Sequence, residues 1–462
     1  MSKDYKYQSE FLYWKEEDIE KSILNKNFKK NCFSFESFLN SNLPSDKIST
    51  DTFIKKYYNI NWSQIISSER AFTDYSMLQG STGNRKESLN YIENLVINIS
   101  SFISCHLQGK RGVVCQTADT ILSHIVFKLA KFYKVKIFTV VPCLVYESKR
   151  GGGFFGNDEF LKSDLMISRY GKLKKHMFTK QDILRINNIK NKIIGFKNKT
   201  EFSDKMKGTN VGKNAISPQV NKIFKYLIYN KKQDKNIFYT KIDPLQKLKA
   251  NFFRLCRKYY GNFLGVYGNV NIENIPSKSI FYAMHFQPEQ STLTQGNWYL
   301  NQIALIENIS KSLPLGYHLI IKEHPWGRGT RPIWQYQYLS NFHNIMFCDA
   351  GTKDIIQKTK AVLTISGSII LEALVLDKPA IMFGKNFFDY AELIYKIDNI
   401  SELPNILFNI LVLEKRLSKN KREEELNRLL LSYLDSLIDC FPDKLGANSW
   451  AKALFNGIKV SS

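Results

Sequence analysis

The chain has 462 residues, 44% of them apolar and 13% aromatic, so it is too long for one small core and too apolar for a disordered protein. We expect two α/β domains of roughly 200 residues each. The net charge of +24 favours an anionic partner such as phospholipid or acidic polysaccharide. A proteome rich in lysine would give the same excess, so charge alone does not choose the partner.

The sequence lacks the motifs of several other classes of protein, namely nucleic-acid-binding, disulfide-bonded, secreted and membrane-spanning proteins. No arginine-rich helix, zinc-knuckle spacing or aromatic RNA-binding motif occurs, so nucleic acid is not expected as a partner. The seven cysteines are dispersed without a CxxC pair, as in reduced cytoplasmic proteins. Residues 1–20 are charged, and no apolar run reaches about 18 residues. We expect a cytoplasmic protein, with the inner face of the membrane as a candidate peripheral location.

The first domain is expected to span residues 1–270. Residues 1–110 read mainly as helices, and a strand at 112–116, a helix at 119–133 and a strand at 135–141 form one βαβ unit. Asp119 and Thr120 stand where a helix N-cap belongs. The basic glycine-rich stretch 149–156 is interpreted as a connecting loop, with contact to an anionic acceptor as the alternative, because it lacks P-loop spacing.

A basic insertion around 190–235 precedes an amphipathic helix at 246–260 and a linker at 261–277. The second domain is expected at 271–462. Its strands are predicted at 279–284, 317–321 and 361–365, and its helices at 298–313, 352–359, 369–376 and 403–441.

Polar motifs follow the three predicted strands of the second domain. They are Gln287-Pro288-Glu289, Lys322-Glu323-His324-Pro325 and Ser366-Gly367-Ser368. Because the carboxyl ends of strands form the ligand crevice of open α/β sheets, these motifs predict one site for a phosphorylated ligand.

In that site, small residues at Ser366, Gly367 and Ser368 would let backbone N–H groups approach a phosphate at the start of a helix. A tight turn without a ligand has the same composition. Glu372, one helical turn further on, is positioned to accept hydrogen bonds from ribose hydroxyls, and a solvated helix residue is the alternative.

The loop after the second strand concentrates cationic donors suited to a leaving phosphate: Lys322, His324, Arg328 and Arg331. A solvated basic loop explains them equally well. Glu289 is a candidate general base, or a cap of the next segment, whereas His285 is interpreted as a core histidine.

The first domain must supply an acceptor-side acid or base, for which Glu69 and Asp119 are the candidates. Neither a metal site nor an organic cofactor is expected, because no histidine has ligand spacing with cysteine or carboxylate and no DxD pair occurs as a Mg²⁺ clamp.

The motifs in residues 281–384 resemble the capsule polysaccharide biosynthesis family, whose pattern continues through Leu371-Glu372-Ala373-Leu374, Lys378-Pro379 and Phe383-Gly384. That family includes retaining β-Kdo transferases. The resemblance implies a GT-B fold, with two Rossmann-like domains facing across a cleft and a nucleotide sugar held by the second. Gln287–Glu289 and His324-Pro325 would line the donor site. The His-Pro motif is also similar to that of bacterial sialyltransferases, which use CMP-activated sugars.

The function implied is transfer of Kdo or another CMP-activated acid sugar to a glycolipid or polysaccharide acceptor, with an anionic membrane surface as a further candidate partner. Two alternatives stay open. One is a polyol-phosphate transferase of teichoic-acid type, whose fold and motifs are similar. The other is a non-catalytic glycan-binding assembly protein.

Overall fold

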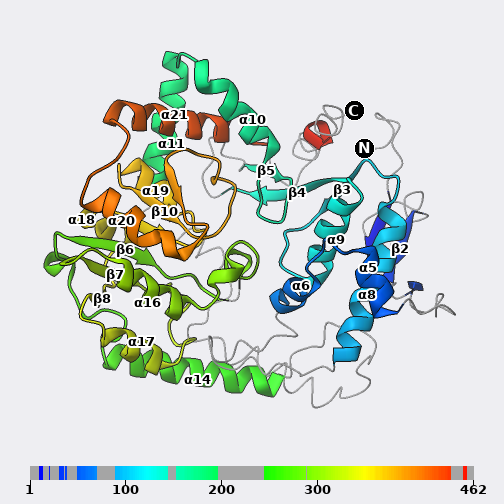
Figure 1. Cartoon of the computed structure of the whole chain (residues 1–462), viewed down its shortest axis with the longest axis horizontal. Helices are drawn as coiled ribbons and strands as arrows, with labels where there is room; N and C mark the ends of the chain where they lie inside the picture. Colours follow the sequence, from blue (N-terminus) through cyan, green and yellow to red (C-terminus); the bar gives the residue numbers. More distant parts are fainter. Residues whose placement is uncertain are drawn as a thin grey trace.

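The computed structural model describes residues 10–13, 20, 31–35, 37–38, 49–69, 89–143, 152–195, 244–287, 289–438 and 451–454. These residues form two lobes, shown side by side in Figure 1. The lobe at the left holds a six-stranded sheet with helices on both faces, and the lobe at the right combines helices with a three-stranded sheet. The predicted α/β class is confirmed.

The right-hand lobe contains the predicted βαβ unit. Strand β3 (Gly112–Cys115) pairs in parallel with β4 (Lys136–Pro142), and α9 (Ile121–Phe132) connects them. The lobe also contains helices α5 (Thr50–Lys56), α6 (Trp62–Ser68) and α8 (Leu89–Leu107), and an unpredicted parallel pair, β1 (Phe11–Tyr13) with β2 (Cys32–Ser34). Among the described residues, the buried members of its apolar core lie between Phe35 and Ile137, and Leu12 packs against them.

Of the two N-cap candidates for α9, the structure confirms Thr120, since Thr120 and Ser123 exchange hydrogen bonds in a capping box. One local prediction in this part of the chain needs correction. The predicted glycine-rich loop contains strand β5 (Gly153–Gly156), which pairs antiparallel with β4 and has a largely buried, apolar centre. Residues 149–151 of that stretch lie outside the described residues.

The left-hand lobe contains a wholly parallel sheet in the order β11-β10-β9-β6-β7-β8. Its strands are β6 (Ser279–Ala283), β7 (His318–Lys322), β8 (Ile345–Phe347), β9 (Val362–Thr364), β10 (Ala380–Met382) and β11 (Ile394–Lys396). Read from β8, the order is third, second, first, fourth, fifth, sixth, which is that of the Rossmann fold. The strand order therefore identifies a nucleotide-binding type of sheet and agrees with the predicted GT-B-like fold.

Alternate residues of these strands enter two separate cores. Ile280 and Tyr282 of β6 face α16 (Gln302–Ser312), α17 (Ile333–Ser340) and α20 (Leu403–Leu411), whereas Phe281 faces the opposite core. That second core includes α18 (Thr352–Lys358) and α19 (Ile369–Val375). Burial on both faces explains why the strands read as continuous apolar runs.

The second core also contains chain from before residue 270. Helices α10 (Asp164–Lys172) and α11 (Lys180–Gly195) pack against α21 (Lys419–Leu434), and α11 also contacts α19. Figure 1 shows α10, α11 and α21 together above the six-stranded sheet. The boundary at residue 270 stays a prediction, but the apolar packing crosses it. Of the predicted insertion, residues 190–195 lie in α11, and 196–235 lie outside the described residues.

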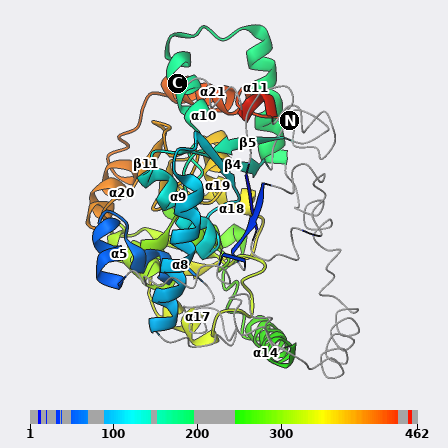
Figure 2. The ribbon, with the colours of Figure 1, turned by 90° about the vertical axis from the view of Figure 1, so that its right-hand side faces the viewer.

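The predicted closing helix at 403–441 is two helices, α20 and α21, separated by residues 412–418. Beyond α21, Ile438 exchanges two backbone hydrogen bonds with Gly153 at the edge of β5, of 2.9 and 2.7 Å. The predicted amphipathic helix is confirmed as α14 (Pro244–Phe263), which lies along the lower side of the molecule in both views (Figures 1 and 2). Within the ranges described, no helix is long and apolar enough to cross a bilayer.

Candidate functional site

The candidate site lies where the strand order reverses, between β6 and β9. Ligands of open α/β sheets bind at this position, outside the carboxyl ends of the strands. Here β6 leads into His285, and β9 leads into Ser366 and Gly367. The sheet register places these two loops next to each other, because Tyr282 pairs with Leu363.

His285 is the residue that joins the two loops. Its Nε2 lies 2.8 Å from Thr364 Oγ1 and accepts a hydrogen bond from the Ser366 backbone N–H at 3.4 Å. Gly367 N–H donates to the same threonine hydroxyl at 3.3 Å. Because an N–H donor points at Nε2, this nitrogen must be unprotonated, and the imidazole is the neutral tautomer with its proton on Nδ1.

The surroundings of His285 support the neutral form. Desolvation lowers the pKa of His285 to about 3, and the neighbouring His324 and Arg331 act in the same direction. Its backbone is held as firmly as its ring, since Gln302 accepts from His285 N–H at 2.8 Å and donates to His285 C=O at 2.9 Å. The interpretation of His285 as a core histidine is consistent with these contacts, and it also orders the loop after β9.

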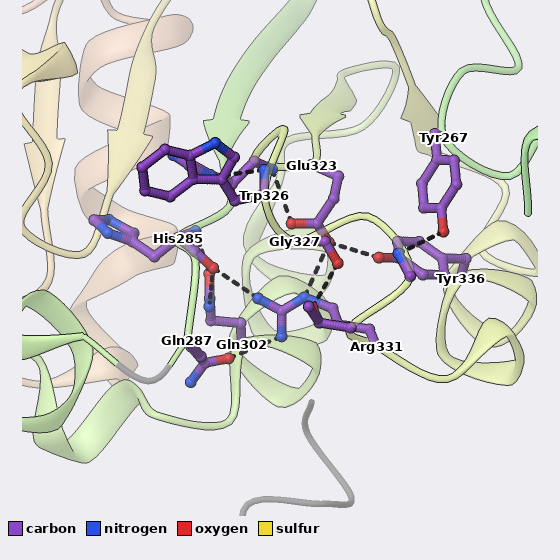
Figure 3. A network of polar contacts seen from close by, with 12 residues as sticks. Tyr267, His285, Gln287, Gln302, Glu323, Trp326, Gly327, Arg331 and Tyr336 are labelled. Carbon is purple, nitrogen blue, oxygen red and sulfur yellow. Dashed lines mark hydrogen bonds and ion pairs between the residues drawn. The ribbon is translucent and has the colours of Figure 1, made fainter. Parts of the chain in front are cut away.

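Arg331 is the centre of a second buried network, shown in Figure 3. Its guanidinium donates to Glu323 Oε2 at 2.9 Å, to Gln287 Oε1 at 2.8 Å and to the carbonyl of His285 at 2.7 Å. Tyr336 also donates to Glu323 Oε2, at 2.7 Å. Arg331 and Glu323 are almost completely buried. Arg331 therefore ties the loops after β6 and β7 together, and a phosphate contact is not its role in this arrangement.

Gln287 is, like Arg331, buried and hydrogen-bonded within the protein. Besides accepting from Arg331, its amide donates to the carbonyl of Leu300 at 2.6 Å, and the side chain is buried. Both ends of the amide are thus engaged within the protein. Direct contact of Gln287 with a donor stays a prediction, while the structure gives it a positioning role.

The other cations predicted for a phosphate lie around the loop after β7. Lys322 Nζ reaches the carbonyl of Ala350 at 2.5 Å and Thr352 Oγ1 at 3.3 Å, so it points toward the end of β8. Arg328 forms an ion pair with Asp349 and lies over the ring of Tyr267. Each would have to share or exchange these contacts to meet a ligand.

His324 is half-buried beside two aromatic rings. Its Nδ1 accepts from Trp326 N–H at 3.2 Å, and its ring centroid lies 6.0 Å from that of Phe286 and 5.9 Å from that of Trp326. Since Nδ1 is an acceptor, Nε2 carries the proton of the neutral ring and is the atom that could donate to a ligand. Glu323 Oε1 accepts from His324 N–H at 2.8 Å and fixes the start of the turn.

The Ser366-Gly367-Ser368 turn differs from the predicted phosphate cradle. The N–H groups of Ser366 and Gly367 point inward to His285 and Thr364, and Ser366 Oγ donates to the carbonyl of Ser291 at 2.9 Å. Ser368 is exposed at the start of α19, and Glu372 is half-buried in its first turn. A cradle made from all three amides would require two of these internal bonds to be exchanged.

The carboxylate candidates lie along the contact between the lobes. Glu289 is the N-cap of α15 (Gln290–Leu293), with its N–H 3.5 Å from Thr292 Oγ1. In the other lobe Glu69 is buried, and its Oε2 accepts from Ile121 N–H at 2.7 Å at the start of α9. The sequence offered no structural reason for Glu69; stabilising the positive end of a helix is one.

Residues after α15 join the two lobes next to these carboxylates. Thr294 Oγ1 donates to the carbonyl of Ala118 at 2.7 Å, one residue before Asp119, which is half-buried. Ser68 Oγ donates to the carbonyl of Leu293 at 3.0 Å, one residue before Glu69. The structure therefore brings the neighbourhoods of Glu69, Asp119 and Glu289 to one interface. Catalytic roles for these three residues remain predictions.

Sequence reasoning missed four residues of this region: Gln302, Glu323, Thr364 and Tyr336. Glu323 lies inside the quoted motif, and a carboxylate directly after a buried strand was the available signal. Gln302 and Tyr336 bind across helices distant in sequence, so the sequence carried no signal for them. No cluster of metal-ligating side chains occurs among the residues that the structure describes.

A cavity of about 730 Å³ lies elsewhere, between α19, β11 and α21. Its lining includes Asp377, which is bound by Arg416 and Arg422, and it opens beside the amino end of β10, marked by Pro379. We place the candidate site at the carboxyl ends instead, because ligands of this sheet type bind there.

The comparison with family models gives one match. Residues 193–400 match the family described as "Capsule polysaccharide biosynthesis protein", a little less than half of the chain. None of the curated proteins compared with the chain matches it.

Solved structures give distant likenesses. The chain is 11% identical to the β-Kdo 2,7 transferase of KpsC from Thermosulfurimonas dismutans, covering 75% of this chain and 87% of that one with a TM-score of 0.34. The chain is 10% identical to the β-Kdo 2,4 transferase of the same KpsC, with a TM-score of 0.30, and the match covers 70% of this chain and 78% of that one. It is 13% identical to Anabaena Alr3699/HepE in complex with UDP and glucose, with a TM-score of 0.24, and the match covers 43% of this chain and 52% of that one.

At such TM-scores the fold assignment rests on the chain's own strand order, and the family assignment on the matched segment. That segment contains all six strands of the parallel sheet and both motifs around His285 and His324. The similarity to the capsule polysaccharide biosynthesis family therefore lies in residues 193–400 of this chain.

Proposed function

We propose that this protein is a GT-B glycosyltransferase of capsular or other surface polysaccharide biosynthesis, which moves a sugar from a nucleotide donor to a glycolipid or polysaccharide acceptor. One observation carries the proposal: the family match spans a sheet with Rossmann strand order and includes both loops at its switch point. Nucleotides bind at that position in sheets of this order.

The proposed donor is Kdo or another acid sugar activated as its CMP derivative. In the reaction, the bond between the sugar carbon and the phosphate oxygen breaks, and the phosphate leaves with the electron pair. His324 Nε2–H, with Lys322 and Arg328, would stabilise the charge on that phosphate. The acceptor hydroxyl oxygen forms the new bond to the sugar carbon and loses its proton to a carboxylate.

The carboxylates are assigned by position. Glu289, at the end of the β6 loop, would serve the reacting sugar, and Glu372, on α19, would bind the ribose hydroxyls. Glu69 or Asp119 would receive the acceptor proton, because both lie next to residues that contact the opposite lobe. We further propose a cytoplasmic protein located peripherally at the inner face of the membrane, where a lipid-linked acceptor would be reached.

The first experiment is a thermal-shift comparison of the purified chain with CMP, CDP, UDP and GDP. A ligand that binds only the folded state stabilises by about 2.7 kcal/mol at a hundredfold excess over Kd. A CMP-selective shift is expected. A UDP or GDP preference would keep the nucleotide-binding fold and discard the acid-sugar donor, and a shift with none of the four would favour a glycan-binding assembly protein.

His324→Ala tests the residue predicted to meet the phosphate. Loss of one donor aimed at a developing charge is expected to lower turnover by roughly 100-fold. His343→Ala is the matched control, because His343 is exposed and precedes β8 at the opposite edge of the sheet. Equal turnover of the two variants would remove His324 from the mechanism. A CDP preference with a phosphodiester in the product would identify the polyol-phosphate transferase instead.

A further inference from the structure

Helix α14 is amphipathic, but its apolar side faces away from the protein. A surface helix ordinarily buries its apolar stripe against the core and turns its charges to solvent. In α14 the orientation is reversed over residues 252–263, the part whose side chains are described. The inward and outward sides of the helix differ in their contacts.

The inward side is basic. Arg254 donates to the carbonyl of Trp326 at 2.8 Å, and Arg257 donates to the carbonyl of Thr330 at 3.4 Å. Gly261 faces the ring of Tyr267 so closely that a Cβ there would lie 2.7 Å from it. These contacts fix the rotation of the helix. Carbonyls satisfy the guanidinium hydrogen bonds without neutralising their charge.

The outward side is aromatic. It consists of residues at helical spacings of three and four, all exposed: Phe252, Leu255, Cys256, Tyr259, Tyr260 and Phe263. Tyr259 is 71% exposed and Phe263 is 85% exposed. A continuous apolar stripe of this kind on a protein surface marks an interaction site. Figure 2 shows α14 at the lower margin of the molecule.

The charge of the helix selects the partner. The sequence of α14 contains five Lys and Arg and no Asp or Glu, in a chain of net charge +24. A second copy seated on the stripe would bring two such helices together against their mutual repulsion. An anionic lipid surface complements the charge and accepts the rings, because Phe inserts at the acyl boundary and Tyr keeps its hydroxyl among the headgroups.

We propose that α14 is the surface through which this protein docks on an anionic lipid bilayer, with the stripe Phe252, Leu255, Cys256, Tyr259, Tyr260 and Phe263 inserted at the headgroup level. This gives the peripheral location proposed above a specific surface, and it rests on that location but not on the identity of the donor. Through Arg254 and Arg257, the docked helix holds the loop that carries His324. Docking therefore brings the donor-side loop close to the lipid surface.

Cys256 allows a test with the unmodified chain. We would measure alkylation rates of Cys256 and Cys105 by peptide mass spectrometry, with phosphatidylcholine vesicles and with vesicles that also contain phosphatidylglycerol. Both cysteines are exposed, and Cys105 lies in α8 of the other lobe. The anionic vesicles are expected to slow Cys256 severalfold and leave Cys105 unchanged. Equal rates for Cys256 with and without anionic vesicles would overturn the proposal.

A triple substitution, Phe252→Ser with Tyr259→Ser and Phe263→Ser, gives the second test by vesicle co-sedimentation. Partitioning onto anionic vesicles should fall by roughly tenfold or more. The control is Leu315→Ser with Tyr58→Ser and Met177→Ser, which are comparably exposed positions on other elements. Equal losses in the two triples would refute a role for α14. So would a wild-type dimer, seen by light scattering without lipid, that the stripe variant abolishes. The nucleotide thermal-shift experiment proposed above is independent of either outcome.

Discussion

His285 lies between the loops after β6 and β9, and its ring is neutral because an N–H group donates to Nε2. Its folded-state pKa of about 3 lies below the ordinary value of 6.5. The unfolded chain therefore binds more protons between these values. It follows that His285 makes the free energy of unfolding fall as the pH drops through this window.

This pH dependence predicts the behaviour of His285→Gln. From about pH 7 to pH 5, protonation of an unfolded histidine costs the wild type about 2 kcal/mol of stability, which a glutamine variant does not lose. We would measure urea unfolding of both proteins at each pH. The stability difference between wild type and variant should shrink by this amount at the lower pH. A difference independent of pH would mean that folding does not lower the pKa of His285.

Substitution of Arg331 is expected to cost much more stability than substitution of Arg328. Arg331→Met leaves Glu323 as an uncompensated buried charge, so we expect a loss of roughly 3–5 kcal/mol in the free energy of unfolding. Arg328→Met breaks an ion pair in which the Asp349 side chain is 47% exposed, and the expected loss is below about 1 kcal/mol. Chemical denaturation would compare them. Similar losses in the two variants would contradict the role of Arg331 as the buried link.

The sequence located Arg331 but not its role. Motifs after apolar runs indicated the correct edge of the sheet, because the carboxyl ends of parallel strands meet there. A basic residue in a loop is usually solvated, and nothing in the local sequence shows that Arg331 meets Glu323 and Gln287 instead. The inward direction of the Ser366 and Gly367 amides likewise depends on His285, which is distant in the chain.

At the scale of elements, the segment after β10 clamps both loops of the site. Gly384 N–H donates to Ile365 C=O at 2.7 Å, and Lys385 N–H donates to Gln295 C=O at 2.9 Å. A Cβ on Gly384 would lie 2.7 Å from the Gln295 oxygen and 3.0 Å from the Ile365 oxygen. Both neighbours are backbone atoms, so no side-chain rotation relieves the contact.

Gly384→Ala should therefore lower the free energy of unfolding by about 1–3 kcal/mol and weaken nucleotide binding. Gly171→Ala is the control, because a Cβ at that position would meet no atom within 4 Å and alanine favours the helix α10. Thermal unfolding and the nucleotide shift would both be measured. A Gly384→Ala protein as stable as the control would show that the two loops can separate without cost.

Element prediction succeeded for long patterns and failed for short ones. The strands β6, β7 and β9 are apolar runs followed by motifs, and α14 has a clear helical period. The strands β8, β10 and β11 have three residues each, too few for a period to show, and β9, although equally short, lies in the longer apolar run 361–365 that ends in a motif. The break between α20 and α21 was missed because its Lys, Arg and Ser residues also suit a solvated helix. Neither pattern nor propensity showed which side of α14 faces the protein.

At the scale of the molecule, the apolar cores group the chain differently from the two predicted domains. The buried members of one core lie between Phe35 and Ile137 in the described part of the chain, whereas Phe154, Tyr170 and Ile186 share a core with α19 and α21. A fragment of residues 152–462 is therefore expected to unfold cooperatively. A fragment of residues 271–462 should lack a stable fold, because α19 and α21 would lose the partners α10 and α11. Circular dichroism during thermal unfolding would distinguish them, and cooperative unfolding of the shorter fragment would restore the boundary at 270.

The pairing of Gly153 with Ile438 has a consequence for solubility. Strand β5 is the last strand of its sheet among the described residues, and an edge strand offers its backbone groups to any extended chain that approaches. Ile438 occupies those groups at one point with a residue that the same chain supplies after α21. Ile438 therefore reduces the number of backbone groups at this edge that are open to strand addition by other molecules. A chain cut directly before Ile438 should expose these backbone groups of β5 and aggregate more readily than the full chain.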